Sequence, residues 1–137
     1  MCKAKISNAS ASCAAPATLV SGTHAVTASY HGSYATSSTK FTLTTRKLAT
    51  AIHASTVKTI KRGSRLTVRA SRLPAAATGI VTVANGSTKL CSTKVRDGSA
   101  NCTFTVRLTK GTKSITVRYG GARNYATAKQ TFGIQVI

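Results

Sequence analysis

The four cysteines are the residues whose spacing most plainly indicates chemistry. Cys2 and Cys13 are eleven residues apart, and Cys91 and Cys102 repeat that spacing. Between the second pair, the run Arg96-Asp97-Gly98 has the composition of a tight turn. A hairpin built on that turn would bring the two cysteines within the Cα separation that a disulfide requires. We therefore predict the disulfides Cys2–Cys13 and Cys91–Cys102.

Structural zinc and free thiols are the competing interpretations of the cysteines. Zinc ligands usually come in pairs separated by two to four residues, and the cysteines form no such pair. Four buried free thiols would suit a cytoplasmic protein, whereas small all-β modules with paired cysteines usually occur in oxidising compartments. We expect a secreted protein, extracellular or on the cell surface, although the chain opens on no recognisable signal peptide.

Groups for catalysis are scarce. The chain has no Glu, and Asp97 is its only Asp, so it cannot build a glycosidase carboxylate pair or a carboxylate-rich Ca²⁺ or Mg²⁺ site. A Ser-His-Asp triad would have to use Asp97, which the adjacent Gly98 marks as a turn residue. The three histidines have no evident partner in the sequence. We expect no enzyme, no metal site and no cofactor.

Positive charge dominates the composition. Lys and Arg total 20 and the formal net charge is +19, with sixteen of the basic residues in residues 47–137. Arg65 and Arg69 alternate with apolar residues and would share the outward face of one strand. The densest basic stretch is the candidate polyanion-binding site, and its residues are Lys58, Lys61, Arg62, Arg65, Arg69 and Arg72.

A surface of this charge attracts acidic polymers and acidic proteins, more strongly at low salt. Nucleic-acid readers normally add a recognition helix or aromatic stacking platforms, and this chain has no Trp, three Phe and four Tyr. We therefore expect an acidic surface polymer or an acidic protein as partner in preference to nucleic acid. The alternative interpretation is that the positive charge serves only to keep the protein soluble. The sequence contains no apolar stretch of about 18 residues, so we predict no membrane span.

The chain contains an internal repeat. A shift of 89 residues places residues 2–32 on residues 91–121 without gaps, and 11 of those 31 positions are identical, including both cysteines. Further along the shift becomes 91, so that Phe41 meets Phe132. Residues 47–89 have no counterpart in the first copy. The chain therefore reads as the back half of one module followed by a complete module.

Polar and apolar residues alternate with the period of two that half-buried strands have, and helical spacing is absent. Turn residues with tolerance for positive φ separate the alternating runs. Seven short antiparallel strands in about 90 residues fit an immunoglobulin-like β-sandwich. We predict these strands near residues 50–57, 64–71, 79–84, 88–95, 99–106, 113–119 and 127–136.

Two motifs give the chain a resemblance to a known family. The first is Gly-Thr, two residues, Ile or Val, Thr, two residues and Tyr, found at 22–30 and at 111–119. The second is Ser-Tyr-Ala at 33–35 and Asn-Tyr-Ala at 124–126. With these motifs the chain resembles the bacterial Ig-like repeats found in tandem on surface proteins. The resemblance covers nearly the whole chain and implies an all-β, Ig-like sandwich fold with a structural role.

We therefore predict two tandem modules: residues 1–46 as the C-terminal half of an Ig-like module, and residues 47–137 as a complete one. Half a sandwich leaves strand edges open. Either upstream residues of a longer protein or another subunit would complete it, so residues 1–46 are a candidate region for self-association. The expected function is a non-catalytic stalk, spacer or surface coat element. Two alternatives stay open, a subunit or decoration protein of a filament or virion and a polyanion-binding module.

Overall fold

The computed structural model describes residues 1–16 and 19–137, and all regular secondary structure in those ranges is β-strand. The chain divides into two compact units, Met1–Arg46 and Lys47–Ile137. Among the described residues there is no helix with the length and apolar character needed to cross a membrane. The predicted all-β class is confirmed.

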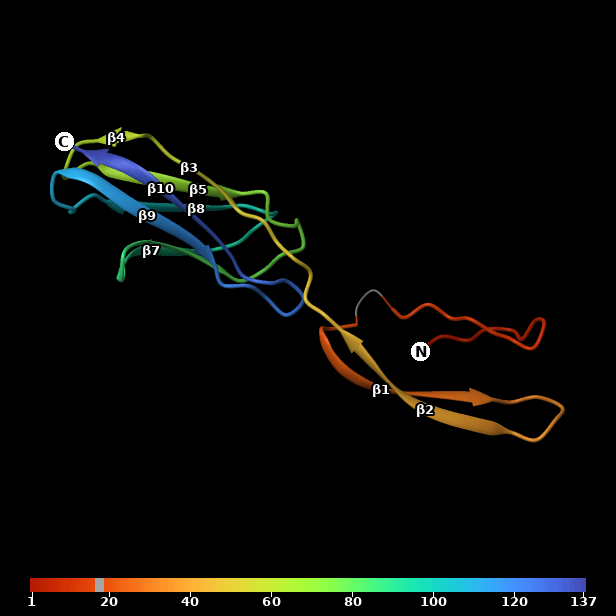
Figure 1. Ribbon diagram of the computed structural model, residues 1–137. Helices are drawn as coiled ribbons and strands as arrows, with labels where there is room; N and C mark the ends of the chain where they lie inside the picture. Colours follow the sequence, from red (N-terminus) through yellow and green to blue (C-terminus); the bar gives the residue numbers. More distant parts are fainter. Residues whose placement is uncertain (17–18) are drawn as a thin grey trace. The chain divides into compact units, whose positions relative to one another are not determined.

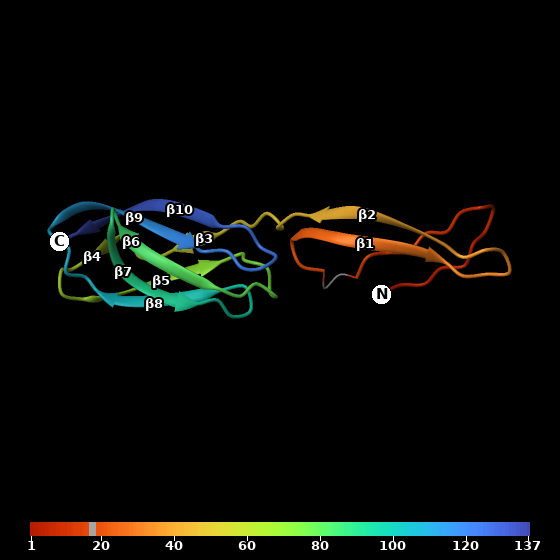
Figure 2. The ribbon, with the colours of Figure 1, turned by 90° about the horizontal axis from the view of Figure 1, so that it is seen from below.

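The second unit is a sandwich of two sheets. The larger sheet has the order β4-β10-β9-β6-β7, and the smaller has the order β3-β5-β8. Figure 1 and Figure 2 show the two layers, with β9 and β10 in one and β5 and β8 in the other. The strands are β3 (His53–Ser55), β4 (Thr59–Ile60), β5 (Arg65–Ser71), β6 (Ile80–Asn85), β7 (Thr88–Lys94), β8 (Ala100–Thr105), β9 (Gly111–Tyr119) and β10 (Ala128–Val136).

The core of this unit follows from the alternation in its strands. In β5, Leu66 and Val68 are buried while their neighbours on either side face solvent. In β9, Ile115, Val117 and Tyr119 are fully buried in the same way. Burying a side chain of this size contributes about 1.5–3 kcal/mol. No polar or charged residue of the described ranges is buried, so apolar packing between the sheets holds this unit together.

The first predicted strand, residues 50–57, is wrong in its extent, because only β3 lies within it, and β4, which was not predicted, follows in the other sheet. β3 pairs antiparallel with β5, and β4 pairs parallel with β10. The chain crosses between the sheets near Thr56, whose Oγ1 donates a 2.9 Å hydrogen bond to the carbonyl oxygen of Thr67. Two residues further on, the backbone carbonyl oxygen of Lys58 accepts a 2.7 Å hydrogen bond from the backbone N–H of Gln135 in β10. One segment thus covers an edge of each sheet.

The predicted hairpin of residues 88–95 and 99–106 is also wrong, since β7 and β8 lie in different sheets. β7 pairs with β6 and β8 with β5, and the two arms pair with each other only at an isolated backbone bridge between Arg96 and Ser99. The cysteines of the pair still meet, with a Cα–Cα distance of 6.1 Å between Cys91 and Cys102. This disulfide therefore links the two sheets instead of bracing a hairpin.

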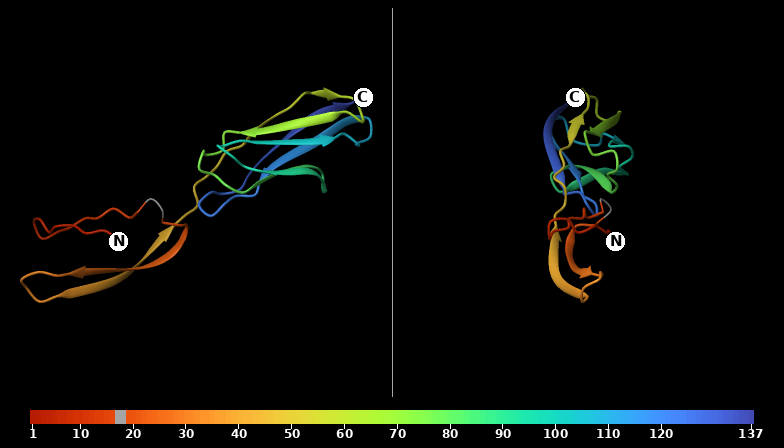
Figure 3. Two further views of the ribbon diagram at one scale, coloured as in Figure 1. Left: turned by 180° about the vertical axis from the view of Figure 1, so that it is seen from behind. Right: turned by 90° about the vertical axis from the view of Figure 1, so that its right-hand side faces the viewer.

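The first unit contains one two-stranded antiparallel ribbon, β1 (Gly22–Tyr30) with β2 (Ser37–Thr45), drawn in orange and gold in Figure 3. In β1–β2, Gly22 pairs with Thr45 and Tyr30 with Ser37. The β9–β10 ribbon has the equivalent register, with Gly111 opposite Val136 and Tyr119 opposite Ala128. The sequence repeat is therefore a repeat of structure as well, residue for residue in this ribbon.

Candidate functional site

The outward side of the β3-β5-β8 sheet, called here the β5 face, carries two of the predicted site residues. Arg65 and Arg69 are exposed on β5, about 13 Å apart along the strand. Between them Thr67 Oγ1 lies 2.8 Å from Thr103 Oγ1 of the neighbouring β8. Asn101 lies opposite Arg69. The β5 face is thus an exposed strip of hydroxyl and amide groups with an arginine at either end.

The other four predicted residues are all exposed but fall into two places. Arg62 precedes β5 and Arg72 follows it, so both extend the basic character of β5 beyond its ends. Arg62 also lines a shallow hollow with Arg107, which the sequence reasoning did not select. Lys58 and Lys61 flank β4 at the edge of the other sheet. The six residues therefore do not form a single track.

A second basic pair lies on the outward side of the larger sheet. Arg118 of β9 is directly opposite Lys129 of β10, and both are exposed. The row continues through Thr82 of β6 and Ser92 of β7. Like charges directly opposite each other destabilise a sheet, so this pair costs the larger sheet some stability. The sequence reasoning missed it because the pairing depends on the β9–β10 register.

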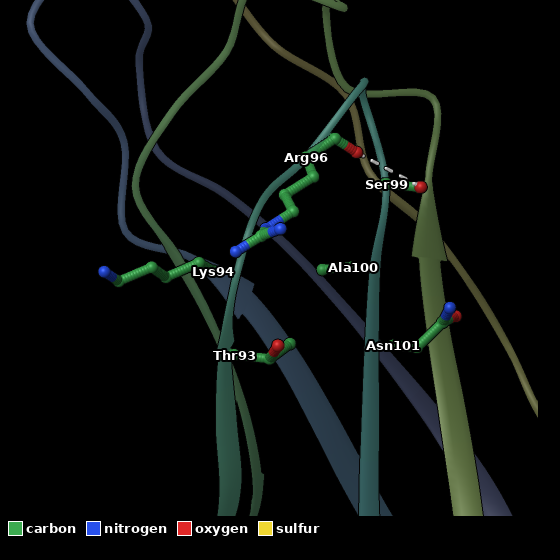
Figure 4. A pocket seen from close by; sticks show the side chains of 6 residues that line it. All are labelled: Thr93, Lys94, Arg96, Ser99, Ala100 and Asn101. Atoms are coloured by element: carbon green, nitrogen blue, oxygen red, sulfur yellow. Dashed lines mark hydrogen bonds between the residues drawn. The ribbon is translucent and has the colours of Figure 1, made fainter.

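A further hollow lies where β7 and β8 part toward separate sheets, and Figure 4 shows its lining. The residues are Thr93, Lys94, Arg96, Ser99, Ala100 and Asn101. Ser99 Oγ donates a 3.3 Å hydrogen bond to the Arg96 carbonyl oxygen, while the Lys94 side chain points away from the others. The hollow has cations, hydroxyls and an amide but no carboxylate. It can contact an anion, but it does not converge on a small ligand.

The residues considered for catalysis, His24 and Asp97, take part in local backbone structure. His24 Nε2–H donates to the Val20 carbonyl oxygen at 2.7 Å, which ties the start of β1 to the preceding segment. Asp97 has a φ of 48° and Gly98 a φ of 72°, as the predicted tight turn requires. Within residues 1–16 and 19–137, no three His, Cys, Asp or Glu residues gather into a possible metal site.

One titratable group in the described ranges has a clearly altered pKa. Burial, and secondarily the neighbouring Tyr125, raises the pKa of the Tyr119 hydroxyl above its ordinary value. The same hydroxyl donates a 2.6 Å hydrogen bond to the Thr78 carbonyl oxygen in the loop before β6. A buried, neutral tyrosine whose hydroxyl donates to a backbone carbonyl is a structural element, because a substrate cannot reach that hydroxyl.

The two cysteine pairs lie at disulfide distance, each with a Cα–Cα separation of 6.1 Å. The described part of the chain has no free cysteine. In the first unit the pair Cys2 and Cys13 encloses a turn in which Asn8 and Ala9 have positive φ. That turn is the counterpart of Asp97-Gly98, so the repeated spacing encodes a repeated, cross-linked loop.

Comparison with known proteins gives one informative match. The family model for the bacterial Ig-like domain (group 3) matches residues 52–137. No curated protein matches the chain.

Two solved structures are distantly similar in shape. Superoxide reductase (neelaredoxin) from Ignicoccus hospitalis has 10% identity and a TM-score of 0.49, over 64% of this chain and 80% of that one. The sulfur carrier protein SoxY from Chlorobium limicola f thiosulfatophilum has 14% identity and a TM-score of 0.47, over 67% of this chain and 84% of that one.

Proposed function

Because the chain belongs to the bacterial Ig-like domain family, as its sequence motifs predict, we propose that it is a non-catalytic structural module of a secreted or surface protein. Its β5 face holds acidic polymers or acidic proteins. The module acts as a spacer or coat element, and electrostatic contacts fix it to its surroundings.

The cysteines support the extracellular assignment. Both pairs lie at disulfide distance in short, equivalent loops. Disulfides persist in oxidising compartments and are rare in the cytosol. A small domain that cannot bury a large core gains stability from such cross-links.

The β5 face is the observation that carries the binding proposal. Arg65 and Arg69 lie on an exposed strip with hydroxyl groups between them. The spacing of about 13 Å lets an extended polymer reach both guanidinium groups at once. Since Asp97 is the only carboxylate side chain in the sequence, almost nothing within the chain competes for these cations. Arginine binds carboxylate and phosphate groups with paired hydrogen bonds.

The test is a salt titration of binding to poly-L-glutamate and, separately, to polyphosphate. Replacing Arg65→Thr together with Arg69→Thr keeps strand propensity and is expected to weaken binding roughly tenfold at low salt. The slope of log affinity against log salt should fall by roughly one to two. The preference between the two polymers identifies the anionic group.

The matched control is Arg118→Thr with Lys129→Thr, which removes the same charge from the opposite face. This control should retain most of the binding. Equal losses in the two double variants would show that total charge, and not the β5 face, holds the polymer. Binding that does not respond to salt would contradict the electrostatic proposal.

A filament or virion subunit is the second candidate, and the first unit favours it. β1 pairs with β2 on one side only, and no other described strand pairs with it. An open edge of this kind can pair with another chain. Ordered polymers of the purified chain in electron micrographs would support this candidate over an isolated spacer.

A further inference from the structure

In the first unit, a segment forms a β-strand only where the strand that it would pair with is also present in that unit. Its β1–β2 ribbon corresponds to β9–β10, which pair with each other. Residues 2–5 and 11–16 correspond in sequence to parts of β7 and β8, yet they form no strand, and an isolated bridge joins Ser7 and Ser10 between them. In the complete unit, β7 pairs with β6 and β8 with β5. Both partners lie in residues 47–89, which have no counterpart in the first unit.

The inner face of β1–β2 is uncovered where its equivalent is buried. Ile115 and Val117 have 0% exposure, whereas their counterparts Val26 and Ala28 are half-buried and exposed. Phe41 is 51% exposed. A ribbon of two strands with an open apolar face is marginal in water by itself. The face therefore has the composition of a buried surface without the layer that would bury it.

Tyr119 and Tyr30, which occupy equivalent positions in the two copies, show what the missing layer would supply. Tyr119 is fully buried and donates to the Thr78 carbonyl oxygen, in the segment that the first unit lacks. Tyr30 occupies the equivalent position and is only half-buried. Its ring lies against Gly32, and no hydrogen bond joins its hydroxyl to any residue in the described ranges. Tyr30 thus lacks both the packed layer that buries Tyr119 and the carbonyl oxygen that accepts the Tyr119 hydrogen bond.

We infer that the face and open edge of β1–β2 are an acceptor for one occupant, a segment equivalent to residues 47–90, joined in the same polypeptide ahead of Cys2. The internal repeat supports this choice, because residues 47–90 cover the equivalent ribbon and lead directly into Cys91. The occupant supplies a strand like β6 that pairs antiparallel with β1. It also supplies a carbonyl oxygen for Tyr30.

The register of this pairing follows from the complete unit. Val81 lies opposite Tyr119 and Val83 opposite Val117, so the equivalent residues of the occupant lie opposite Tyr30 and Ala28. Ala28 is smaller than Val117. The true occupant therefore carries a bulkier side chain against Ala28 than residues 47–90 offer, and a copy of residues 47–90 fits there with a small void.

The experiment adds a copy of residues 47–90 directly before Cys2 and measures trypsin cleavage after Lys40, which lies on β2. In the 137-residue chain Lys40 should be cut at least tenfold faster than Lys129, the basic residue on the equivalent strand β10. The added copy should slow the cut at Lys40 toward the Lys129 rate. The same addition carrying Val81→Asp and Val83→Asp in the copy should not slow it.

Ala28→Val provides a second readout. In the extended protein it fills the void and should slow cleavage at Lys40 further, whereas in the 137-residue chain the rate should stay the same. Failure of the added copy to protect Lys40 would overturn the inference. So would a 137-residue chain that is monomeric by light scattering with Lys40 already resistant. A dimer with resistant Lys40 would overturn it too, because a second copy would then be the occupant.

Discussion

Tyr119 Oη donates a 2.6 Å hydrogen bond to the carbonyl oxygen of Thr78, 41 residues earlier in the chain. The bond ties the end of β9 to the loop that leads into β6. Gly79 makes this contact possible, since its φ is +104° and a Cβ there would lie 2.6 Å from the Gly121 carbonyl oxygen and 3.3 Å from the Tyr119 ring. The tyrosine thus closes one end of the sandwich.

Tyr119→Phe keeps the ring and removes the hydrogen bond. The Thr78 carbonyl then loses its donor, and we expect the free energy of unfolding of the second unit to fall by about 1–2 kcal/mol. Denaturant unfolding followed by circular dichroism measures the loss. The control is Tyr34→Phe, at a residue that is 84% exposed, which should change stability by less than about 0.5 kcal/mol. Equal losses in the free energy of unfolding from the two substitutions would contradict a structural role for the Tyr119 hydrogen bond.

The stability of the second unit should also fall in alkali. Burial, with Tyr125 as a second cause, raises the pKa of Tyr119 above its ordinary value of 10.0. As the pH rises past 10, the unfolded state loses this proton while the folded state keeps it, so the unfolded state gains stability. The free energy of unfolding should decrease more steeply with pH in the native chain than in Tyr119→Phe. Parallel pH curves for the two proteins would contradict the buried, neutral hydroxyl.

The disulfide between Cys91 and Cys102 should stabilise the second unit. It joins β7 to β8 across the two sheets and closes a short loop with a separation of 11 residues. Replacing both cysteines with Ala should lower the free energy of unfolding by about 2–3 kcal/mol. Replacing Cys2 and Cys13 in the same way should leave unfolding of this unit unchanged, because they belong to the other unit. Titration of the native protein with a thiol reagent should find no free thiol.

Gly98→Ala should destabilise the second unit more than Gly86→Ala. Both glycines have positive φ, so both substitutions carry the backbone cost of about 1 kcal/mol. At Gly98, however, a Cβ would meet the Leu73 carbonyl oxygen, whereas it would find open space at Gly86. We expect an additional loss of about 1–2 kcal/mol at Gly98, measured by denaturant unfolding. Similar losses at the two sites would argue against this close approach.

Alternation in the sequence predicts which side chains face inward, and it is reliable in β5, β8 and β9 because one face of each of these strands is buried. It places Arg65 and Arg69 on a common outward face, as the structure has them. It does not reveal which sheet a strand joins. The short connection at Asp97-Gly98 suits both a paired hairpin and a crossing between sheets, and β7 and β8 take the second course because β6 and β5 are their partners.

The repeat carries more information than the alternation does. It predicts that residues 22–30 and 111–119 take the same conformation, and the ribbon registers agree with this. Pairings across a loop stay hidden until the register is known. Arg118 and Lys129 are eleven residues apart in sequence, and only the β9–β10 register places them opposite each other. The second basic face was missed for this reason.

The claim that β1 lacks the neighbouring strand that β9 has can be measured by amide hydrogen exchange in the native 137-residue chain. In β9, residues 115–119 pair with β6 on one side and β10 on the other. We predict slow exchange throughout those residues and fast exchange at the amides of residues 26–30 that point away from β2. Equal protection of the two strands in a monomeric sample would contradict the claim.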